Sequence, residues 1–323
     1  MGRTVLVTGV SRYLGGRMAA LLAADPEVAT VIGVDVVAPE REIPGTSFVR
    51  ADIRNPVIAK VMGESGVDTV VHMGVIATPK QAGGRSTMKE INVIGTMQLL
   101  AACQRTPSVR SLVVKSTASV YGSGPKDPAK FTEDMEPKHA PSHGWAKDSV
   151  EVETYVRGFA RRRPDVSVTT LRFANVIGPR VQTAITGYFS LPVIPTVLGF
   201  DPRLQFVHED DLLESIRTAV RTARRGTFNV AGDGVLLLSQ AVRRTGRRWI
   251  IVPRLMFSTV GRSLGPAGLA DFSPEAVRYL TYGRGLDTTA MRTVLGFEPA
   301  WTSDAAFMSF VGRSEARVSV DVA

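Results

Sequence analysis

The sequence has a single cysteine, Cys103, among 323 residues, so no disulfide can form within the chain. No cysteines and histidines stand at the spacing of zinc ligands, and we therefore predict no structural metal. Both absences are typical of a reducing compartment, which favours a cytoplasmic protein.

Long apolar runs are also missing. No stretch of 18 or more residues is apolar, which predicts a chain without a membrane-spanning helix. The first residues lead directly into a strand-like segment at 4–8, so we expect no secretion signal and no membrane partner. The contents of 44% hydrophobic and 21% charged residues are those of an ordinary globular protein.

Aromatic residues are few, at 7%, although the formal net charge is +9. The arginine clusters at 161–163 and 243–248 follow helix-like segments, where the helix dipole favours cations. They lack the interleaved aromatic residues that a base-stacking surface needs. We therefore predict no nucleic-acid partner.

Short β-branched runs alternate with segments of helical periodicity. This alternation predicts an α/β fold with a doubly wound parallel sheet, and the continuous apolar strands predict burial on both faces. The predicted strands are Thr4–Thr8, Val31–Asp35, Ser47–Arg50, Thr69–Met73, Ser111–Ser116, Ser167–Phe173 and Gly226–Val230.

The alternation loosens after about residue 180, and the segment from 234 onward is mostly helical in period. We predict a main domain over 1–179 plus roughly 205–232. A smaller, mainly helical C-terminal lobe would hold roughly 180–204 and 233–323. Within that lobe, an apolar helix face that begins at Leu255 predicts either a lid near 253–282 or a helix packed on its own lobe.

A glycine-containing turn, Thr8–Gly16, lies between the first strand and the first helix. Glycines in such a turn let backbone N–H groups approach a pyrophosphate at the helix N-terminus. The spacing is imperfect because Arg12 stands where the pattern has its middle glycine, so an ordinary strand–helix turn is the alternative. The predicted contacts with a dinucleotide are Gly9, Ser11, Arg12, Tyr13, Leu14 and Gly15.

Asp35 ends the next strand. An acidic side chain at this sequence separation from the glycine-containing turn binds the ribose hydroxyls of NAD and repels a 2′-phosphate. Arg12 instead favours NADP, because a guanidinium binds a 2′-phosphate with two hydrogen bonds. We therefore predict NADP or NAD, with the reduced form as hydride donor, and leave the choice open.

Later motifs resemble those of extended short-chain dehydrogenases/reductases, the NAD-dependent epimerase/dehydratase family, in the same order along the chain. The segments that carry the resemblance are Asp52-Ile53, Val71-His72-Met73-Gly74, Asn92-Val93-Ile94-Gly95-Thr96, 115–122 (KSTASVYG), 171–179 (LRFANVIGP), 206–211 (FVHEDD) and 295–297 (LGF). The resemblance covers nearly the whole chain and implies a Rossmann fold. It also implies cofactor contacts from Asp52, Ile53, Met73, Gly74, Lys147, Ala174, Asn175 and Val176.

One motif departs from the family. Its members carry Y-x-x-x-K on a helix, with both side chains on one face, whereas this chain has His143 in place of the tyrosine and retains Lys147. The resemblance implies that Lys147 holds the nicotinamide ribose and that the Thr117 hydroxyl bonds the reacting oxygen. Tyr121 is no substitute, because the family has a tyrosine there too. His143 is either a replacement acid/base or a bystander.

Loss of the tyrosine favours reduction of a ketone, which needs only an acid: water, His143 or a hydroxyl of the substrate itself. The chain also resembles tyrosine-less reductases that act on angucyclinones. Our first hypothesis is therefore an NAD(P)H-dependent ketoreductase that reduces a large aromatic polyketide in antibiotic biosynthesis.

Two alternatives remain. One is a nucleotide-sugar 4-epimerase or dehydratase that uses His143, with Arg180, Arg203 and Arg284 as candidates to clamp a diphosphate. The usual R-P-G-D stretch of such enzymes is missing before Asp287. The other alternative is a non-catalytic NAD(P)-binding sensor. The sequence leaves the oligomeric state open.

Overall fold

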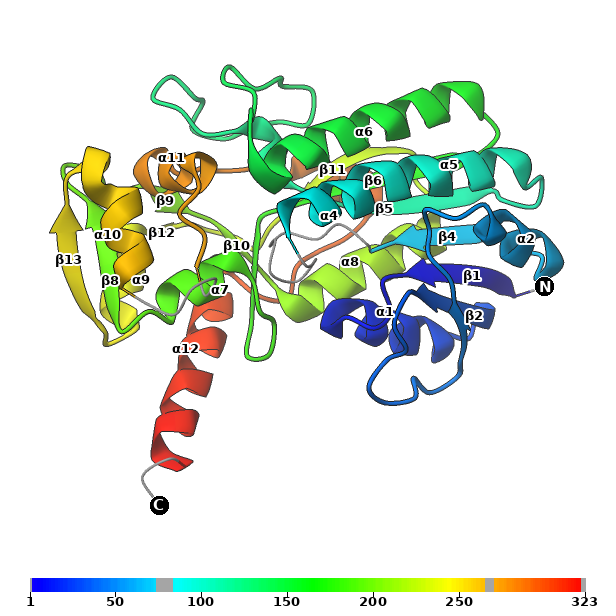
Figure 1. The fold of residues 1–323 in the computed structure, drawn as a ribbon, viewed down its shortest axis with the longest axis horizontal. Coiled ribbons are helices and arrows are strands. Elements are labelled where there is room, and N and C mark those ends of the chain that lie inside the picture. Colours follow the sequence, from blue (N-terminus) through cyan, green and yellow to red (C-terminus); the bar gives the residue numbers. More distant parts are fainter. Residues whose placement is uncertain (1, 74–83, 265–269, 321–323) are drawn as a thin grey trace.

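The computed structural model describes residues 2–73, 84–264 and 270–320, and its centre is a seven-stranded sheet (Figure 1). All seven strands run parallel, in the order β11-β6-β5-β4-β1-β2-β3. They span β1 Arg3–Thr8, β2 Val28–Asp35, β3 Thr46–Arg50, β4 Thr69–His72, β5 Ser111–Thr117, β6 Ser167–Phe173 and β11 Gly226–Val230. The predicted doubly wound sheet is confirmed, and each predicted strand takes part in it.

Helices cover both faces of the sheet because its strands are apolar on both. Val5 and Val7 pack in one core with residues of α1 (Tyr13–Ala23) and α8 (Glu209–Thr222). Leu6, between them, points to the other face. There it joins a second core formed with α2 (Val57–Glu64), α5 (Thr96–Arg105) and α6 (Gly144–Arg162). Figure 1 shows α5 and α6 above the sheet and α1 and α8 below it.

The strand order reverses between β1 and β4. From β1 the chain adds β2 and β3 on one side, and from β4 it adds β5 and β6 on the other. In open parallel sheets such a reversal leaves a crevice at the carboxyl ends of the two central strands, where ligands bind. Thr8, at the end of β1, pairs with His72, at the end of β4.

The C-terminal part contains helices and also short strands. Its helices are α7 Ala184–Phe189, α9 Leu238–Arg244, α10 Phe257–Ser263, α11 Pro274–Tyr282 and α12 Ser303–Val320. β13 (Arg248–Val252) pairs parallel with β8 (Val193–Val197), and β12 (Leu236–Leu237) pairs antiparallel with β9 (Arg203–Leu204). The helical periodicity after residue 234 did not predict β12 and β13. The domain boundaries themselves stay a prediction.

The remaining elements are short. They are α4 Arg85–Lys89, η1 Glu90–Gly95, η2 Ala118–Tyr121, β7 Asn175–Ile177, which pairs with β10 Phe206–His208, η3 Arg254–Met256 and η4 Met291–Leu295. Within the described residues, no helix is both long and apolar enough to cross a bilayer.

Candidate active site

The turn after β1 can be built only with glycine at two positions. Gly9 adopts φ 77°, and a Cβ on Gly15 would lie 2.0 Å from the carbonyl oxygen of Gly9. Arg12 is the last extended residue before α1, so the N-terminus of this helix opens onto the crevice. The turn therefore has the close backbone approach and the helix terminus that a pyrophosphate needs.

Asp35 is fixed beside this turn at the end of β2. Its carboxylate accepts hydrogen bonds from the backbone N–H groups of Ser11 (3.1 Å) and Val36 (2.8 Å). Burial lowers the pKa of Arg12, and the negative charge of Asp35 opposes that shift. The two side chains also line one hollow of about 510 Å³ at the carboxyl ends of β1, β2 and β3, together with Thr8, Gly9, Val34, Val36, Ala51, Asp52, Ile53, Arg54 and Ile91. These residues fit the adenosine half of a dinucleotide.

The polar groups of two predicted cofactor residues, Asp52 and Tyr13, are hydrogen-bonded to other side chains. The Asp52 carboxylate is bonded by the Arg54 guanidinium (2.6 Å), which lowers the pKa of Asp52. The Tyr13 hydroxyl donates to Oε1 of Glu209 over 2.7 Å. Leu14 packs against the core beneath the sheet. These side chains thus stabilise the walls of the hollow. Any contact of Tyr13 or Leu14 with the cofactor is made by the backbone.

Glu209, the first residue of α8, ties the turn to a distant loop. Its second oxygen accepts hydrogen bonds from the backbone N–H groups of Arg180 (3.2 Å) and Val181 (2.7 Å). Because Glu209 is buried, these bonds compensate for the loss of water around its carboxylate. The sequence motif contained Glu209, but nothing in it indicated a contact with Tyr13, 196 residues away.

His72 is a buried link between β1 and α5. Its Nδ1 lies 2.8 Å from Oγ1 of Thr8, and its Nε2 lies 2.8 Å from Oγ1 of Thr96. Burial and the nearby Lys115 lower the pKa of His72 to about 4. The backbone N–H of Met73 donates to the same Thr8 hydroxyl over 3.2 Å. Met73 therefore lies at the crevice as predicted, whereas Gly74 lies outside the described residues.

The predicted catalytic histidine caps the helix that carries Lys147. His143 is the N-cap of α6, and Lys147 follows one turn later with an exposed side chain. The backbone N–H of His143 donates to Oε1 of Glu275 over 3.0 Å, and its Nδ1 lies 3.5 Å from the same oxygen. The Ser142 hydroxyl lies 2.8 Å from that Nδ1. The imidazole itself is 70% exposed.

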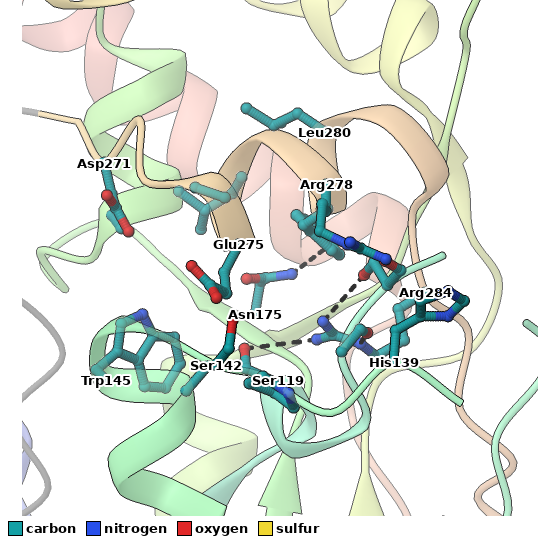
Figure 2. Close-up of a pocket in the computed structure, with 18 of the residues that line it drawn as sticks. Ser119, His139, Ser142, Trp145, Asn175, Asp271, Glu275, Arg278, Leu280 and Arg284 are labelled. Carbon is teal, nitrogen blue, oxygen red and sulfur yellow. Dashed lines mark hydrogen bonds between the residues drawn. The ribbon is translucent and has the colours of Figure 1, made fainter. Parts of the chain in front are cut away.

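A pocket with an empty volume of about 800 Å³ opens at the start of α6, and His143 itself is not among its lining residues (Figure 2). Ser142 and Glu275 line it, and Figure 2 shows the Glu275 carboxylate pointing from α11 toward the start of α6. Glu275 is 19% exposed, and its Oε2 atom is buried without a hydrogen-bond partner. A buried carboxylate oxygen without a hydrogen bond has lost its water without compensation, which costs free energy.

The far side of the pocket is cationic and aromatic. Arg284 donates to the carbonyl oxygen of Gly122 (2.8 Å) and to the Ser123 hydroxyl (3.1 Å), and burial lowers its pKa to about 10. Tyr279, whose ring lies 5.2 Å from the Arg284 guanidinium, belongs to α11. Arg180 and Arg203, the other two clamp candidates, are exposed and do not line the pocket. The remaining lining residues include Ser119, His139, Pro141, Trp145, Ala184, Ile185, Tyr188, Asp271, Arg278 and Leu280.

The structure divides the other predicted site residues between the crevice and the pocket. Thr117 ends β5, where its Oγ1 accepts from the backbone N–H of Ser119 (3.1 Å) and its hydroxyl hydrogen is left for another acceptor. Asn175, predicted as a cofactor contact, lines the pocket and donates to the Tyr279 hydroxyl over 2.5 Å. Ala174 is buried and Val176 packs on the core, so only their backbones remain for the cofactor.

Tyr121 is excluded as a catalytic residue by its burial. It is 1% exposed, its hydroxyl donates to Asn229 (2.8 Å), and it accepts a bond from Arg172 (2.7 Å). Arg172 also forms a buried ion pair with Glu153 of α6 at 2.6 Å. This network fixes α6, and with it His143, to the sheet.

Among the described residues, no group of three or more His, Cys, Asp or Glu is placed to hold a metal ion. The sequence analysis missed Glu275. Ser273 and Pro274 mark a helix start there, but no sequence signal places that helix against His143.

Residues 5–231 match the family model described as the NAD dependent epimerase/dehydratase family. The chain belongs to this family. Its membership agrees with the dinucleotide cofactor that the turn and Asp35 predict. The uncharacterized protein Rv0501 of Mycobacterium tuberculosis is 47% identical over 309 residues, which cover 94% of this chain and 82% of that protein.

Other similar proteins are more distant. The UDP-glucose 4-epimerase of Mycolicibacterium smegmatis is 27% identical over 91% of this chain and 93% of its own length. Among solved structures, a UDP-glucose 4-epimerase of Thermotoga maritima with UDP-glucose has a TM-score of 0.72 at 18% identity, covering 98% of this chain and 99% of that one. The DesIV dTDP-glucose 4,6-dehydratase of Streptomyces venezuelae, with NAD and TYD bound, has a TM-score of 0.72 at 23% identity and covers 98% of both chains. These similarities show the same fold.

Proposed function

We propose that this protein is an NAD(P)-dependent nucleotide-sugar epimerase or dehydratase in which His143 takes the place of the family's tyrosine. The related proteins of stated function named above act on nucleotide sugars. They support this function better than the polyketide ketoreductase that the sequence analysis placed first, for which no named relative gives support.

The observation that carries the proposal is the contact between His143 and Glu275. Nδ1 lies 2.8 Å from the Ser142 hydroxyl and 3.5 Å from the Glu275 carboxylate, so when Nδ1 carries a proton both oxygens can accept it and Nε2 is left free to take or give a proton. The same carboxylate stabilises the ring when it becomes positively charged, as in other acid/base histidines held by a carboxylate. A histidine with an oriented second nitrogen can therefore perform the proton transfer that a sugar hydroxyl requires.

Other residues of the chain bind and orient. Gly9, Gly15 and the N-terminus of α1 form a cradle for the pyrophosphate, and Asp35 is placed to accept bonds from the adenosine ribose. Asp35 would also repel a 2′-phosphate, which favours NAD. When bound, the nicotinamide accepts and returns a hydride. Thr117, at the end of β5, provides its hydroxyl to the reacting oxygen. Lys147, one turn after His143, holds the nicotinamide ribose.

The pocket suits a nucleotide sugar in its charge and its aromatic lining. Arg278 and Arg284 provide positive charge for a diphosphate, while Trp145 and Tyr279 offer aromatic faces on which a base can stack. The Glu275 carboxylate, which lines the pocket, can accept a hydrogen bond from a sugar hydroxyl.

The test is turnover of a defined panel. Purified protein is incubated with NAD or NADP and UDP-glucose, UDP-glucuronic acid or dTDP-glucose, and products are separated by anion-exchange chromatography and identified by NMR. We expect either a C4 epimer or a 4-keto-6-deoxy product from at least one of them. Absence of both products, with oxidation of NADH or NADPH by polycyclic aromatic ketones, would restore the ketoreductase hypothesis. Cofactor binding without turnover of either class would indicate a sensor.

A further inference from the structure

Five apolar side chains that are close in the sequence are exposed at the end of the molecule far from the seven-stranded sheet. Trp249, Ile250 and Ile251 of β13 are 47%, 37% and 54% exposed, and Leu255 and Met256 of η3 are 99% and 56% exposed. We call these five residues the apolar edge. Figure 1 shows β13 and the neighbouring α10 at the left end of the protein, opposite the N-terminus.

Local structure explains why these residues remain exposed. β13 pairs only with β8, so one edge of this strand has no neighbour among the described strands. Val252 and Phe257, which flank the turn at η3, are buried in the core of the C-terminal part and anchor it. Leu255 and Met256 project between these two anchors. Contiguous exposed apolar side chains on a folded protein mark an interaction surface.

The segment that contains the apolar edge carries charge of one sign. Residues 234–270 contain six arginines and no aspartate or glutamate; the arginines are Arg243, Arg244, Arg247, Arg248, Arg254 and Arg262. Arg243, Arg248 and Arg262 are exposed, and none of them has an acidic partner among the described residues. Arg254 is exposed and bonds the neutral hydroxyl of Tyr282 (2.9 Å). Arginines thus predominate around the apolar edge, although Asp304 pairs with Arg244 at 2.7 Å and Asp201 lies beside Trp249 and Ile251.

This combination favours one kind of occupant. A second copy of the chain would bring the same arginines face to face, which costs electrostatic energy. Four of the five exposed apolar residues are aliphatic, so stacking on nucleic-acid bases is not supported. Aliphatic and tryptophan side chains beside arginines are instead typical of surfaces that bind the interface of anionic membranes. A hollow opens beside the strand, and its lining includes Phe200, Val242, Trp249 and Ile251 together with the charged Asp201 and Arg243.

We propose that the apolar edge binds peripherally to membranes that contain anionic phospholipids. Leu255 and Met256 insert among the lipid chains, Trp249 lies at the headgroup level, and Arg248 and Arg262 bind phosphate. The lack of a long apolar run led us to predict no membrane partner, but association with a membrane surface requires no spanning helix. The proposal does not depend on the enzyme's substrate.

The test is co-sedimentation of the full-length protein with sucrose-loaded vesicles. Vesicles of phosphatidylcholine alone are compared with vesicles that also contain phosphatidylglycerol. We expect binding to the anionic vesicles only, and weaker binding as salt screens the charges. The double variant Leu255→Ser/Met256→Ser should lose at least about 10-fold in affinity, and Arg248→Gln/Arg262→Gln should abolish the preference for anionic lipid.

A matched control keeps the test specific. Val294, on η4, is 50% exposed, so Val294→Ser removes a comparable apolar side chain outside the apolar edge and should leave vesicle binding unchanged. Equal binding to both vesicles, or binding to neither, overturns the proposal. A dimer in light scattering that Leu255→Ser/Met256→Ser dissociates would assign the edge to a second copy instead. Binding to polyglutamate but not to anionic vesicles would assign it to an acidic protein.

Discussion

A single oxygen of Glu275, Oε1, lies 3.0 Å from the backbone nitrogen of His143 and 3.5 Å from Nδ1 of its ring. The contact joins the start of α6 to the first turn of α11, 132 residues later in the chain. One carboxylate thus binds the backbone N–H of the residue that stands where the family has its tyrosine and lies at ion-pair distance from its ring.

The first prediction concerns Glu275→Gln. The amide oxygen keeps an acceptor for the backbone N–H of His143, so the fold should persist, but a neutral group no longer stabilises a protonated imidazole. We expect kcat to fall about 10²-fold, with the cofactor dissociation constant unchanged, and the pH dependence of kcat to shift. Glu64→Gln, an exposed residue at the end of α2, is the control. An unchanged pH profile of kcat in Glu275→Gln would mean that Glu275 only caps the backbone.

The second prediction concerns the turn. In Gly15→Ala the added Cβ would meet the carbonyl oxygen of Gly9 at 2.0 Å, so the turn must open and its N–H groups move away from the pyrophosphate. Millimolar NAD should raise the melting temperature of the wild type but not of this variant. Gly63→Ala, in α2, adds a Cβ with nothing within 4 Å and should retain the full shift. A normal shift in Gly15→Ala would refute the assignment of this turn.

The third prediction is a pH dependence of stability. His72 stays neutral in the folded protein because burial lowers its pKa to about 4, against 6.5 when unfolded. The unfolded chain therefore binds the extra proton between these values. Stability is full above about pH 6.5 and is lost as pH falls toward 4, by up to about 3 kcal/mol. Burial also lowers the pKa of His208, which adds a loss of the same sign.

Urea unfolding at pH 7, 6, 5 and 4.5 measures this loss. His72→Gln removes the titrating ring and should flatten the profile relative to the wild type, whatever its absolute stability. A variant profile as steep as that of the wild type would show that His72 does not carry the effect.

Local chemistry made the sheet and the turn predictable. β-branched runs such as Thr69–His72 have no other conformation that would bury their side chains equally well. The spacing of Gly9, Gly15 and Asp35 is set within 27 residues by one strand–helix–strand unit. The partners of the site residues were not predictable in the same way. Tyr13 meets Glu209 and His143 meets Glu275 only because the folded chain brings distant helices together.

Two further features of the structure were not predicted from the sequence, for different reasons. Arg54, only two residues from Asp52, binds the carboxylate for which the family resemblance implies a cofactor contact, and that contact stays a prediction. β13 was missed because its extended form depends on pairing with β8, more than 50 residues earlier, and not on a periodicity of its own. Sequence patterns identify elements that are stable by themselves more readily than those formed by long-range pairing.

The most direct test of the account is the rate of hydride transfer in His143→Phe. Cofactor-loaded protein is mixed with the nucleotide sugar that the panel identifies, and the absorbance of the reduced nicotinamide is followed in a single turnover. We predict a rate about 10²–10⁴-fold below that of the wild type, with unchanged affinities for cofactor and sugar and partial rescue by added imidazole. A variant that turns over at the wild-type rate would contradict the account, because His143 would then be a bystander and the proton would come from another source.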